Sequence, residues 1–386
     1  MRLAIISSHP IQYYAPWFKY MSTILDVHVF YMNEGKTQGL DKDEFGVSFE
    51  WDIDLLDGYK YTFLKNVSKC PGVNNFKGCD VPEIYKTLKK GDFDAVLVMG
   101  WYLKGFLQAI TACKIYKIPL LVRGDSKLES TKNNFKNLIK KIFFPFFLKF
   151  FDIFLYVGEK NKEYLEHFGV PKTKLVFCPH FINQTFFSKD INNFNRTELI
   201  KKMNLRENSF KLLFVGKFIK KKRPLDVLKA LKLLEKDKDD FELLLVGSGD
   251  LDEGLKQFCK SNTSLMVHFL GFKNQSELPD LYRLADVLIL PSEGDETWGL
   301  VINEAFALHT PAIVSTDVGC APDLIRSGLT GEVFERGNIE DLARKIKDIS
   351  RYINSETSKK EIQSKNEIYS IEIATKNLII ALNSLK

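Results

Sequence analysis

The sequence predicts an α/β protein with two doubly wound, Rossmann-like domains. Short runs rich in Val, Ile and Leu recur along the chain and have the length of parallel strands that are buried on both faces. Helical segments separate these runs, as strand-helix-strand crossovers require. Glycine and polar residues gather where strands end, which is where open α/β sheets bind ligands. With 386 residues the chain can hold two such domains, which we expect at residues 1–180 and 209–370 with a linker at 181–208.

The composition is that of a globular protein, with 45% hydrophobic and 27% charged residues. The net charge of +6 falls entirely within residues 1–180. Six scattered cysteines form no CxxC pair and have no histidine at ligand spacing, so we expect reduced thiols and neither a disulfide framework nor a metal site. The first residues have too short an apolar core for a secretion signal, and no segment approaches the roughly 20 apolar residues of a membrane span. We therefore expect a cytoplasmic protein.

The first domain opens with a strand-helix-strand unit. Its strands are expected at residues 2–8 and 26–31, and Pro10 and Pro16 delay its helix to residue 17. Residues 33–80 are polar, aromatic and poorly periodic, which predicts a long functional excursion at the ligand edge of the sheet. Regular structure then resumes. Strands are expected at 94–99, 119–122, 152–157 and 174–178. Helices are expected at 82–90 and 161–168, and a further helix follows residue 102 and ends at about residue 116.

Residues 132–151, which begin at Lys132 and end at Phe151, combine lysines and phenylalanines around Pro145. One interpretation is a domain helix with a charged outer face. The other is a helix that docks on an anionic membrane surface, with aromatic rings in the interface and lysines at the head groups. We favour peripheral membrane contact, because the charge excess falls in this half of the chain.

The second domain is expected to begin with a strand at 211–215, which leads into a basic loop between Gly216 and Pro224. Five basic residues crowded after a strand end would repel one another without an anion. The alternative is a solvated basic loop, but a diphosphate is the better partner because cations stabilise a leaving group as its charge develops. Further strands are expected at 241–246, 267–270, 285–290 and 311–315, and helices at 224–235 and 251–261.

A glutamate-containing stretch follows the strand at 285–290. Gly299 lets the backbone approach a ligand closely, and the amides that open the next helix favour an anion. Glu296 lies in the loop and Glu304 about two helical turns later, so the two carboxylates bracket the anion and can accept hydrogen bonds from hydroxyls. An anion with hydroxylated groups on both sides describes a nucleotide sugar.

This stretch resembles the signature of the retaining glycosyltransferases of family 4, in which seven residues separate two glutamates. The residues that carry the resemblance are Pro291-Ser292, Glu296, Trp298-Gly299 and Glu304-Ala305. Glu296 follows Pro-Ser one residue later than is usual, and Trp298 stands where phenylalanine is commoner. The resemblance implies the GT-B fold, with two Rossmann-like domains facing a central cleft and a helix at 371–385 that returns to the first domain.

The resemblance also implies how a donor is bound. Glu304 would bind the ribose hydroxyls and Glu296 the transferred sugar. Lys217 takes the place of an arginine at the diphosphate, which keeps the charge but loses the bidentate fork. The second diphosphate cation is Lys222 or Arg223. Phe272 would contact the base of the donor. Gly299 and Leu300, at the start of the helix, would complete the diphosphate site.

In the first domain the assignments rest on loops at strand ends. His9 is either a satisfied loop histidine or a contact to donor phosphate or acceptor, and residues 9–16 resemble the opening of one branch of family 4, which favours the contact. Many relatives have a histidine near residue 125 that approaches the transferred sugar, and here Asp125 or Arg123 would substitute for it. We expect acceptor contacts from Gln12, Tyr13, Trp101 and Arg123.

We therefore predict a retaining glycosyltransferase that moves a sugar from a nucleoside diphosphate sugar to a hydroxyl of a glycan or lipid-linked acceptor. No metal, other cofactor or nucleic acid partner is expected. Richness in Lys, Asn, Phe and Ile suggests a bacterial genome and hence a role in surface polysaccharide, such as capsule, O-antigen or lipopolysaccharide, at the inner face of the cytoplasmic membrane. The alternatives are a nucleotide-sugar 2-epimerase or another non-transferase enzyme on the same fold, and a non-catalytic glycan-binding protein.

Overall fold

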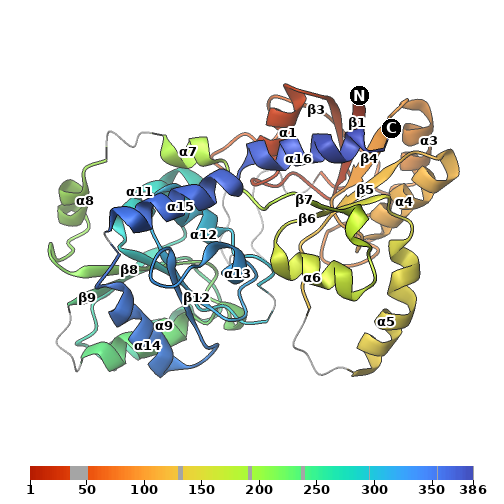
Figure 1. The fold of residues 1–386 in the computed structure, drawn as a ribbon. Helices are drawn as coiled ribbons and strands as arrows, with labels where there is room; N and C mark the ends of the chain where they lie inside the picture. The colour runs from red at the N-terminus through yellow and green to blue at the C-terminus, as the bar shows by residue number, and fades with distance from the viewer. Residues whose placement is uncertain are drawn as a thin grey trace. The chain divides into compact units, whose positions relative to one another are not determined.

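The computed structural model describes residues 1–34, 51–128, 134–189, 194–235, 240–294, 296–353 and 355–385, with the backbone alone for 134–139. These residues form two compact units (Figure 1). Unit 1 takes in the described chain up to Asn183, except Trp51 and Asp52, together with the segment that begins at Ile371. Unit 2 runs from Gln184 to Ser370 and includes Trp51 and Asp52. The expected linker therefore belongs to unit 2 from Gln184 onward, where it contains two short helices.

Unit 1 is a parallel sheet with helices on both faces. Its strands are β1 (Arg2–Ser7), β2 (Asp26–Tyr31), β3 (Lys60–Phe63), β4 (Ala95–Val98), β5 (Leu120–Arg123), β6 (Ile153–Tyr156) and β7 (Leu175–Phe177). Its helices are α1 (Ala15–Ser22), α3 (Glu83–Lys90), α4 (Lys104–Tyr116), α5 (Asn134–Leu148), α6 (Glu159–His167) and α16 (Ile371–Asn383).

Unit 2 is a second parallel sheet with its own helices. Its strands are β8 (Phe210–Val215), β9 (Phe241–Val246), β10 (Val267–Gly271), β11 (Val287–Leu290), β12 (Ala312–Ser315) and β13 (Gly331–Phe334). Its helices are α7 (Gln184–Ser188), α8 (Arg196–Lys202), α9 (Pro224–Leu234), α10 (Asp252–Lys260), α11 (Leu278–Leu284), α12 (Val301–Ala307), α13 (Ala321–Leu324), α14 (Ile339–Ile349) and α15 (Glu356–Ile368).

Both sheets are doubly wound. The strand order is β3-β2-β1-β4-β5-β6-β7 in unit 1 and β10-β9-β8-β11-β12-β13 in unit 2, and all neighbouring strands in the described chain pair in parallel. The order reverses between β1 and β4 and between β8 and β11. Such reversals open the crevices in which open α/β sheets bind ligands. The predicted fold class is confirmed.

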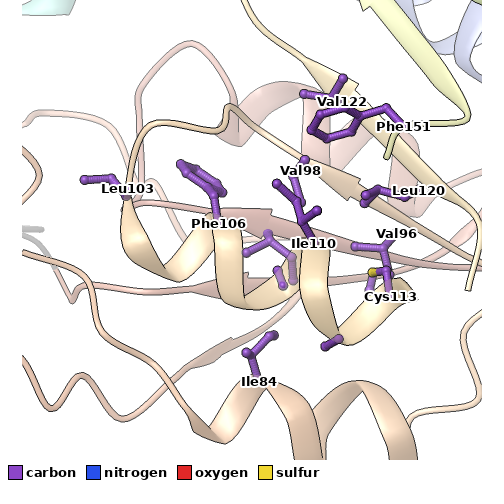
Figure 2. Close-up of a cluster of buried hydrophobic side chains, with 14 of the residues drawn as sticks. Ile84, Val96, Val98, Leu103, Phe106, Ile110, Cys113, Leu120, Val122 and Phe151 are labelled. Atoms are coloured by element: carbon purple, nitrogen blue, oxygen red, sulfur yellow. The ribbon is translucent and has the colours of Figure 1, made fainter. Parts of the chain in front are cut away.

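The strands of unit 1 supply two apolar cores, because alternate side chains of a strand point to opposite faces. On one face, Ala4 and Ile6 of β1 join α3, α4 and α6 in a cluster that Figure 2 shows around Val96, Val98 and Phe106. On the other face, Leu3 and Ile5 pack with α1 and α16. The indole Nε1 of Trp17 donates to Oγ1 of Thr375 at 3.0 Å, so α16 is a structural part of unit 1.

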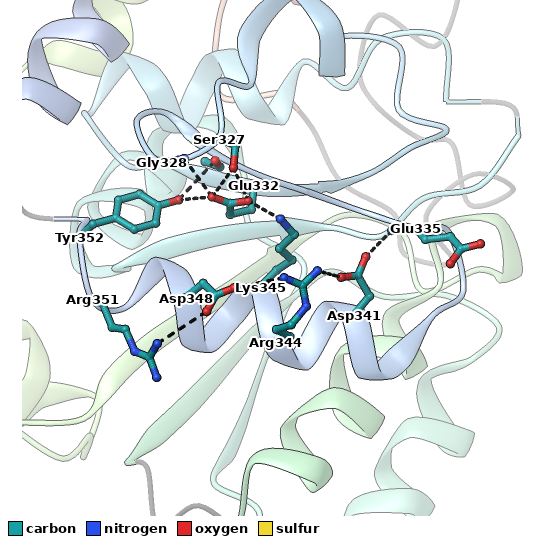
Figure 3. A network of polar contacts seen from close by, with 11 residues as sticks. Ser327, Gly328, Glu332, Glu335, Asp341, Arg344, Lys345, Asp348, Arg351 and Tyr352 are labelled. Atoms are coloured by element: carbon teal, nitrogen blue, oxygen red, sulfur yellow. Dashed lines mark hydrogen bonds and ion pairs between the residues drawn. The ribbon is translucent and has the colours of Figure 1, made fainter.

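In unit 2, α9 and α14 cover one face of the sheet. A buried polar network also joins β13 to α14 and the residues that follow it (Figure 3). Glu332 accepts hydrogen bonds from Nζ of Lys345 at 2.6 Å and from the hydroxyl of Tyr352 at 2.8 Å. Burial alone would raise the pKa of Glu332, but these donors together with Ser327 and Gly328 outweigh burial and lower it. The network therefore fixes the position of α14 on the sheet.

Three features differ from the sequence expectations. The helix α1 begins at Ala15 and not at residue 17, since Pro16 occupies its first turn, where the missing N–H costs nothing. A strand, β3, lies inside the stretch expected to be irregular, and its Lys60–Phe63 segment pairs with β2 at the edge of the sheet. Between residues 331 and 370 the structure also contains β13, α14 and α15, which the sequence expectations do not include. Residues 35–50 of the expected excursion lie outside the described residues.

Candidate functional site

Two loops meet at the switch point of unit 2. Because β8 and β11 are neighbours, the loops that follow them lie side by side at the carboxyl edge of the sheet. The loop after β8 contains the basic residues, with a 3-10 turn at Lys220–Lys222. The loop after β11 contains Glu293 and Glu296, and the amide of Glu293 donates to the carbonyl of Lys221 at 2.8 Å. Two motifs about 70 residues apart in the sequence are thus brought together.

An ion pair joins the two loops. The Nζ atom of Lys222 contacts Oε2 of Glu296, and the two side chains are only 17% and 15% exposed. A shielded cation and carboxylate at a switch point provide a donor for a phosphate and an acceptor for a hydroxyl at one place. A phosphate that binds Lys222 would compete with Glu296 and release its carboxylate. Lys217, which follows Gly216 at the end of β8, is half-buried.

Arg223 has a different environment from Lys222. Its Nε donates to Asp226 at 2.6 Å and its Nη1 to Glu293 at 2.7 Å. Burial opposes the charge of this guanidinium, but the two carboxylates outweigh burial and keep the pKa of Arg223 above its ordinary value. Arg223 therefore anchors the basic loop to α9 and to the glutamate loop. This leaves Lys222 as the better candidate for the second diphosphate cation.

The loop after β12 holds the backbone of the glutamate loop. The amide of Gly319 donates to the carbonyl of Glu296 at 3.1 Å, and the amide of Cys320 donates to that of Trp298 at 3.0 Å. A Cβ atom on residue 319 would lie 1.6 Å from the carbonyl oxygen of Thr297. Only glycine permits this approach. The position of Glu296 thus depends on a residue to which sequence analysis gave no role.

Glu304 is a buried carboxylate of α12 with an exposed fraction of 1%. The hydroxyl of Tyr282 donates to its Oε2 at 2.6 Å. Tyr282 is itself fully buried in α11, and its carbonyl accepts a hydrogen bond from Oγ1 of Thr310 at 2.7 Å. Tyr282 therefore fixes the orientation of Glu304. In the sequence Tyr282 marks only the end of a helix, so no local signal identifies this role.

Residues 298–300 lead directly into α12. Gly299 has a φ of 104°, which favours glycine, and a Cβ there would lie 2.7 Å from Cδ2 of Leu290. Trp298 is 4% exposed, donates from Nε1 to Oδ1 of Asn303 at 2.8 Å, and lies 5.6 Å from the ring of Tyr369. Trp298 therefore packs in the interior of unit 2. Leu300 precedes the first residue of α12 and is half-buried.

Phe272 lies elsewhere on the same edge of the sheet. It follows β10, two strands from β8 on the side away from β11, and it is half-buried. The expected contacts of Phe272 with the base and of Gly299 and Leu300 with the diphosphate remain predictions. In the described part of the chain, no three His, Cys, Asp or Glu side chains gather as a metal site requires.

The switch point of unit 1 lies between the ends of β1 and β4. His9 follows β1, with its Nδ1 atom 3.0 Å from Oγ of Ser8, and Gln12 and Tyr13 are half-buried in the loop before α1. Trp101 follows β4, and its ring lies edge-on to Phe144 at a centroid distance of 5.7 Å. Trp101 thus helps to pack α5 on the sheet. The acceptor contacts of Gln12, Tyr13 and Trp101 remain predictions.

Arg123 is almost fully buried, with an exposed fraction of 2%. Its Nη2 donates to the carbonyl of Pro179 at 2.9 Å, and its guanidinium carbon lies 5.2 to 5.4 Å from the ring centroids of three aromatic residues, namely Tyr14, Trp17 and Phe181. Cation–π contacts of this kind stabilise a desolvated guanidinium. Arg123 therefore joins β5 to α1 and to the segment after β7. Its expected contact with the acceptor remains a prediction.

Asp125 has a histidine neighbour that the sequence does not place there. Oδ2 of Asp125 lies 3.9 Å from Nε2 of His180, and Nη2 of Arg123 lies 3.4 Å from Nδ1 of the same ring. Burial lowers the pKa of His180 to about 4, Asp125 partly offsets that effect, and Arg123 adds to it. The ring is therefore neutral at pH 7. Because a guanidinium can only donate, the ring proton belongs on Nε2, which faces Asp125.

Most of unit 2 is similar to a known protein family. Residues 195–365 match the family model of the glycosyl transferases group 1. The group 1 match contains Lys217, Lys222, Glu296 and Glu304 but covers less than half of the chain.

Solved structures resemble the whole chain. The crystal structure of Anabaena Alr3699/HepE in complex with UDP has a TM-score of 0.75 at 14% identity and covers 100% of both chains. At this identity the likeness shows the fold alone. Together with the two parallel sheets, it identifies the fold as GT-B.

Curated relatives match parts of the chain. An uncharacterized glycosyltransferase of Methanocaldococcus jannaschii is 30% identical over 173 residues, which cover 44% of this chain and 43% of the relative. The UDP-Gal:alpha-D-GlcNAc-diphosphoundecaprenol alpha-1,3-galactosyltransferase of Escherichia coli is 27% identical over 264 residues, 67% of this chain and 66% of the relative. The chain thus spans about half to two thirds of the length of these relatives.

Proposed function

We propose that the protein is a retaining glycosyltransferase that transfers a sugar from a nucleoside diphosphate sugar to a hydroxyl of a glycan or lipid-linked acceptor. The observation that carries the proposal is the Lys222–Glu296 ion pair at the switch point of unit 2, with the oriented carboxylate of Glu304 in the next helix. The group 1 match contains all three residues and supports a glycosyltransferase. The resemblance to family 4 supports the retaining mechanism.

In the proposed complex the donor diphosphate binds Lys217 and Lys222. The contact of Lys222 with the diphosphate replaces its ion pair with Glu296. The released Glu296 carboxylate accepts hydrogen bonds from hydroxyls of the transferred sugar, and Glu304 accepts them from the ribose. When the bond between the anomeric carbon and the diphosphate breaks, charge grows on the leaving oxygen, and the lysines stabilise it without reorganisation. The acceptor hydroxyl attacks from the face that the diphosphate leaves and gives its proton to the departing diphosphate. One glycosidic bond replaces one phosphate ester bond, and the configuration is retained.

The relatives suggest a donor and an acceptor class for this chain. The Anabaena protein was crystallised with UDP, and the E. coli relative is named as a UDP-galactose enzyme acting on a diphosphoundecaprenol-linked sugar. We therefore propose a uridine nucleotide sugar as donor and a polyprenol-diphosphate-linked glycan as acceptor, in the synthesis of a surface polysaccharide. Since the fixed lysine charges serve the diphosphate, the proposal includes independence from metal ions.

A thermal-shift panel tests the donor site first. Purified protein is heated with UDP, GDP, ADP or CMP, each with and without EDTA. A nucleotide at about 100 times its Kd stabilises the folded state by about 2.7 kcal/mol, which raises the Tm by roughly 5–10 °C for a domain of this size. We expect a shift with UDP that survives chelation. No shift with any nucleotide would contradict the donor site, and a shift that EDTA removes would contradict metal independence.

A turnover assay then tests the chemistry. We expect release of UDP from a UDP-sugar only when an acceptor is present, whereas an epimerase would change the donor without an acceptor. Glu296→Gln should lower turnover by at least about 100-fold while keeping the UDP thermal shift. The matched control is Glu340→Gln, which changes an exposed glutamate of α14 and should keep full turnover. Retained turnover in Glu296→Gln would remove Glu296 from the catalytic residues.

A further inference from the structure

We propose that the outer face of α5 docks unit 1 on the surface of an anionic lipid bilayer. The inner face of this helix is firmly packed. Phe144 lies edge-on to Phe168 at 5.0 Å, Phe147 lies edge-on to Phe151 at 5.4 Å, and Leu148 is 4% exposed within the core cluster of this face. The position of α5 on the sheet is therefore determined by its inner face. On the outer face, Phe150 lies edge-on to Phe147 at 6.4 Å.

The outer face is apolar where a surface helix is normally polar. Four side chains point to solvent, with exposed fractions of 52% for Ile142, 67% for Phe143, 65% for Phe146 and 48% for Phe150. We call these four residues the α5 patch. Phe146 follows Ile142 by four residues and Phe143 by three, and Phe150 follows Phe146 by four, so the four side chains lie on one face. The turn continues past Leu148 through a hydrogen bond from the amide of Phe150 to the carbonyl of Phe147 at 3.1 Å.

The exposed apolar area of the α5 patch is large enough to indicate a binding surface. With about 200 Å² for a whole aromatic side chain, its three phenylalanines alone expose roughly 350 Å² of apolar surface. The largest apolar patch of a typical monomer has about this area and is often functional. Scattered exposed apolar residues need no explanation, but a contiguous aromatic stripe does.

The charges around the patch select an anionic partner. Two of the lysines in this segment, Lys141 and Lys149, are described beside the patch, whereas Nζ of Lys140 lies 5.4 Å from the ring centroid of Phe144 on the inner face. Lys141 is exposed, and Nζ of Lys149 lies 5.1 Å from the ring centroid of Phe146. The neighbouring acidic residues on α6 belong to a helix that packs against the inner face of α5, through Tyr164 and Phe168. Lysines that flank aromatic rings suit a bilayer surface, where rings enter the interface and ammonium groups meet lipid phosphates.

A bilayer surface fits these observations better than a second copy of this chain or a membrane-spanning role for α5. Protein interfaces are depleted in lysine, which weakens the case for a second copy of this chain. A membrane-spanning role is excluded for α5, because 15 residues are fewer than the roughly 20 that a span requires. Within the described ranges, no helix meets the length and apolarity of a span. Peripheral docking would hold unit 1 where a lipid-linked acceptor is presented, and only this last link rests on the proposed function.

Vesicle co-sedimentation with the full chain tests the inference. The probes are vesicles of phosphatidylglycerol and phosphatidylethanolamine, with pure phosphatidylcholine vesicles as the neutral comparison. We expect binding to the anionic vesicles that weakens as salt is raised. The double variant Phe143→Ser/Phe146→Ser should lower the partition coefficient at least about tenfold. Lys141→Gln/Lys149→Gln should lower it about 25-fold, because each lysine near an anionic surface contributes about fivefold.

The matched control is Ile380→Ser. Ile380 is 55% exposed on α16, away from α5 in unit 1, and its change should leave the partition coefficient unaltered (Figure 1). Absence of binding to anionic vesicles, equal binding to phosphatidylcholine, or unchanged binding by the phenylalanine variant would each overturn the inference. So would self-association of the wild type in light scattering that the phenylalanine variant abolishes, since a second copy would then cover the patch. Vesicle binding needs neither donor nor acceptor, so the UDP thermal shift reports separately on the proposed function and on the folding of each variant.

Discussion

Removal of one oxygen atom, in Tyr282→Phe, tests whether Glu304 serves the donor. The Tyr282 hydroxyl donates to Oε2 of Glu304 at 2.6 Å, and both side chains are at most 1% exposed. A hydrogen bond to a charged group contributes about 1.5–3 kcal/mol to stability. For a unit of this size, a loss of about 2 kcal/mol lowers the Tm by about 4–8 °C. If Glu304 turns away from the ribose, donor affinity falls as well, by about tenfold for each 1.4 kcal/mol.

Unit 2 offers a matched control for this variant. The hydroxyl of Tyr352 donates to the buried Glu332 at 2.8 Å, and Glu332 has no proposed contact with the donor. Tyr352→Phe should therefore lower the Tm while leaving the Kd for UDP unchanged. Thermal unfolding and calorimetric titration with UDP separate the two effects. If Tyr282→Phe lowers only the Tm, as Tyr352→Phe should, the ribose assignment of Glu304 is refuted and its role is structural.

Two further predictions concern other charged groups. Lys222→Gln should weaken UDP binding about 10- to 100-fold in the same titration, because it removes a charged hydrogen-bond donor. The control is Lys220→Gln, which changes an exposed lysine and should alter the Kd for UDP less than twofold. Equal effects of the two variants would contradict a specific diphosphate site. His180 has a pKa of about 4 when folded and about 6.5 when unfolded, so the folded protein binds fewer protons between these values. The free energy of unfolding should then fall by about 3 kcal/mol as the pH drops from 6.5 to 4, and a similar fall in His180→Gln would refute this assignment.

Local sequence patterns predicted much of the fold. Apolar runs such as those of β4, β8 and β11 are buried on both faces, so the residues themselves indicate the strands. The edge strand β3 was missed because its residues Lys60–Phe63 are exposed or half-buried and have no apolar run. It becomes a strand by pairing with β2, which lies about 30 residues earlier. Sequence patterns alone place the start of α1 too late, because two prolines in one loop predict a delayed helix, whereas a proline fits the first turn of a helix.

The candidate site, like the fold, has features that the sequence predicts and features that depend on the tertiary structure. The sequence by itself determined which residue types lie at the strand ends, and two glutamates, a glycine and a basic loop at the ends of parallel strands predict an anionic, hydroxylated ligand. Only the tertiary structure decided which groups meet. Lys222 contacts Glu296 across 74 residues, and Tyr282 orients Glu304 across 22. The periodicity of side chains along a helix or strand is a local property, but these contacts depend on which strands become neighbours in the sheet, and that is set by packing over the whole unit.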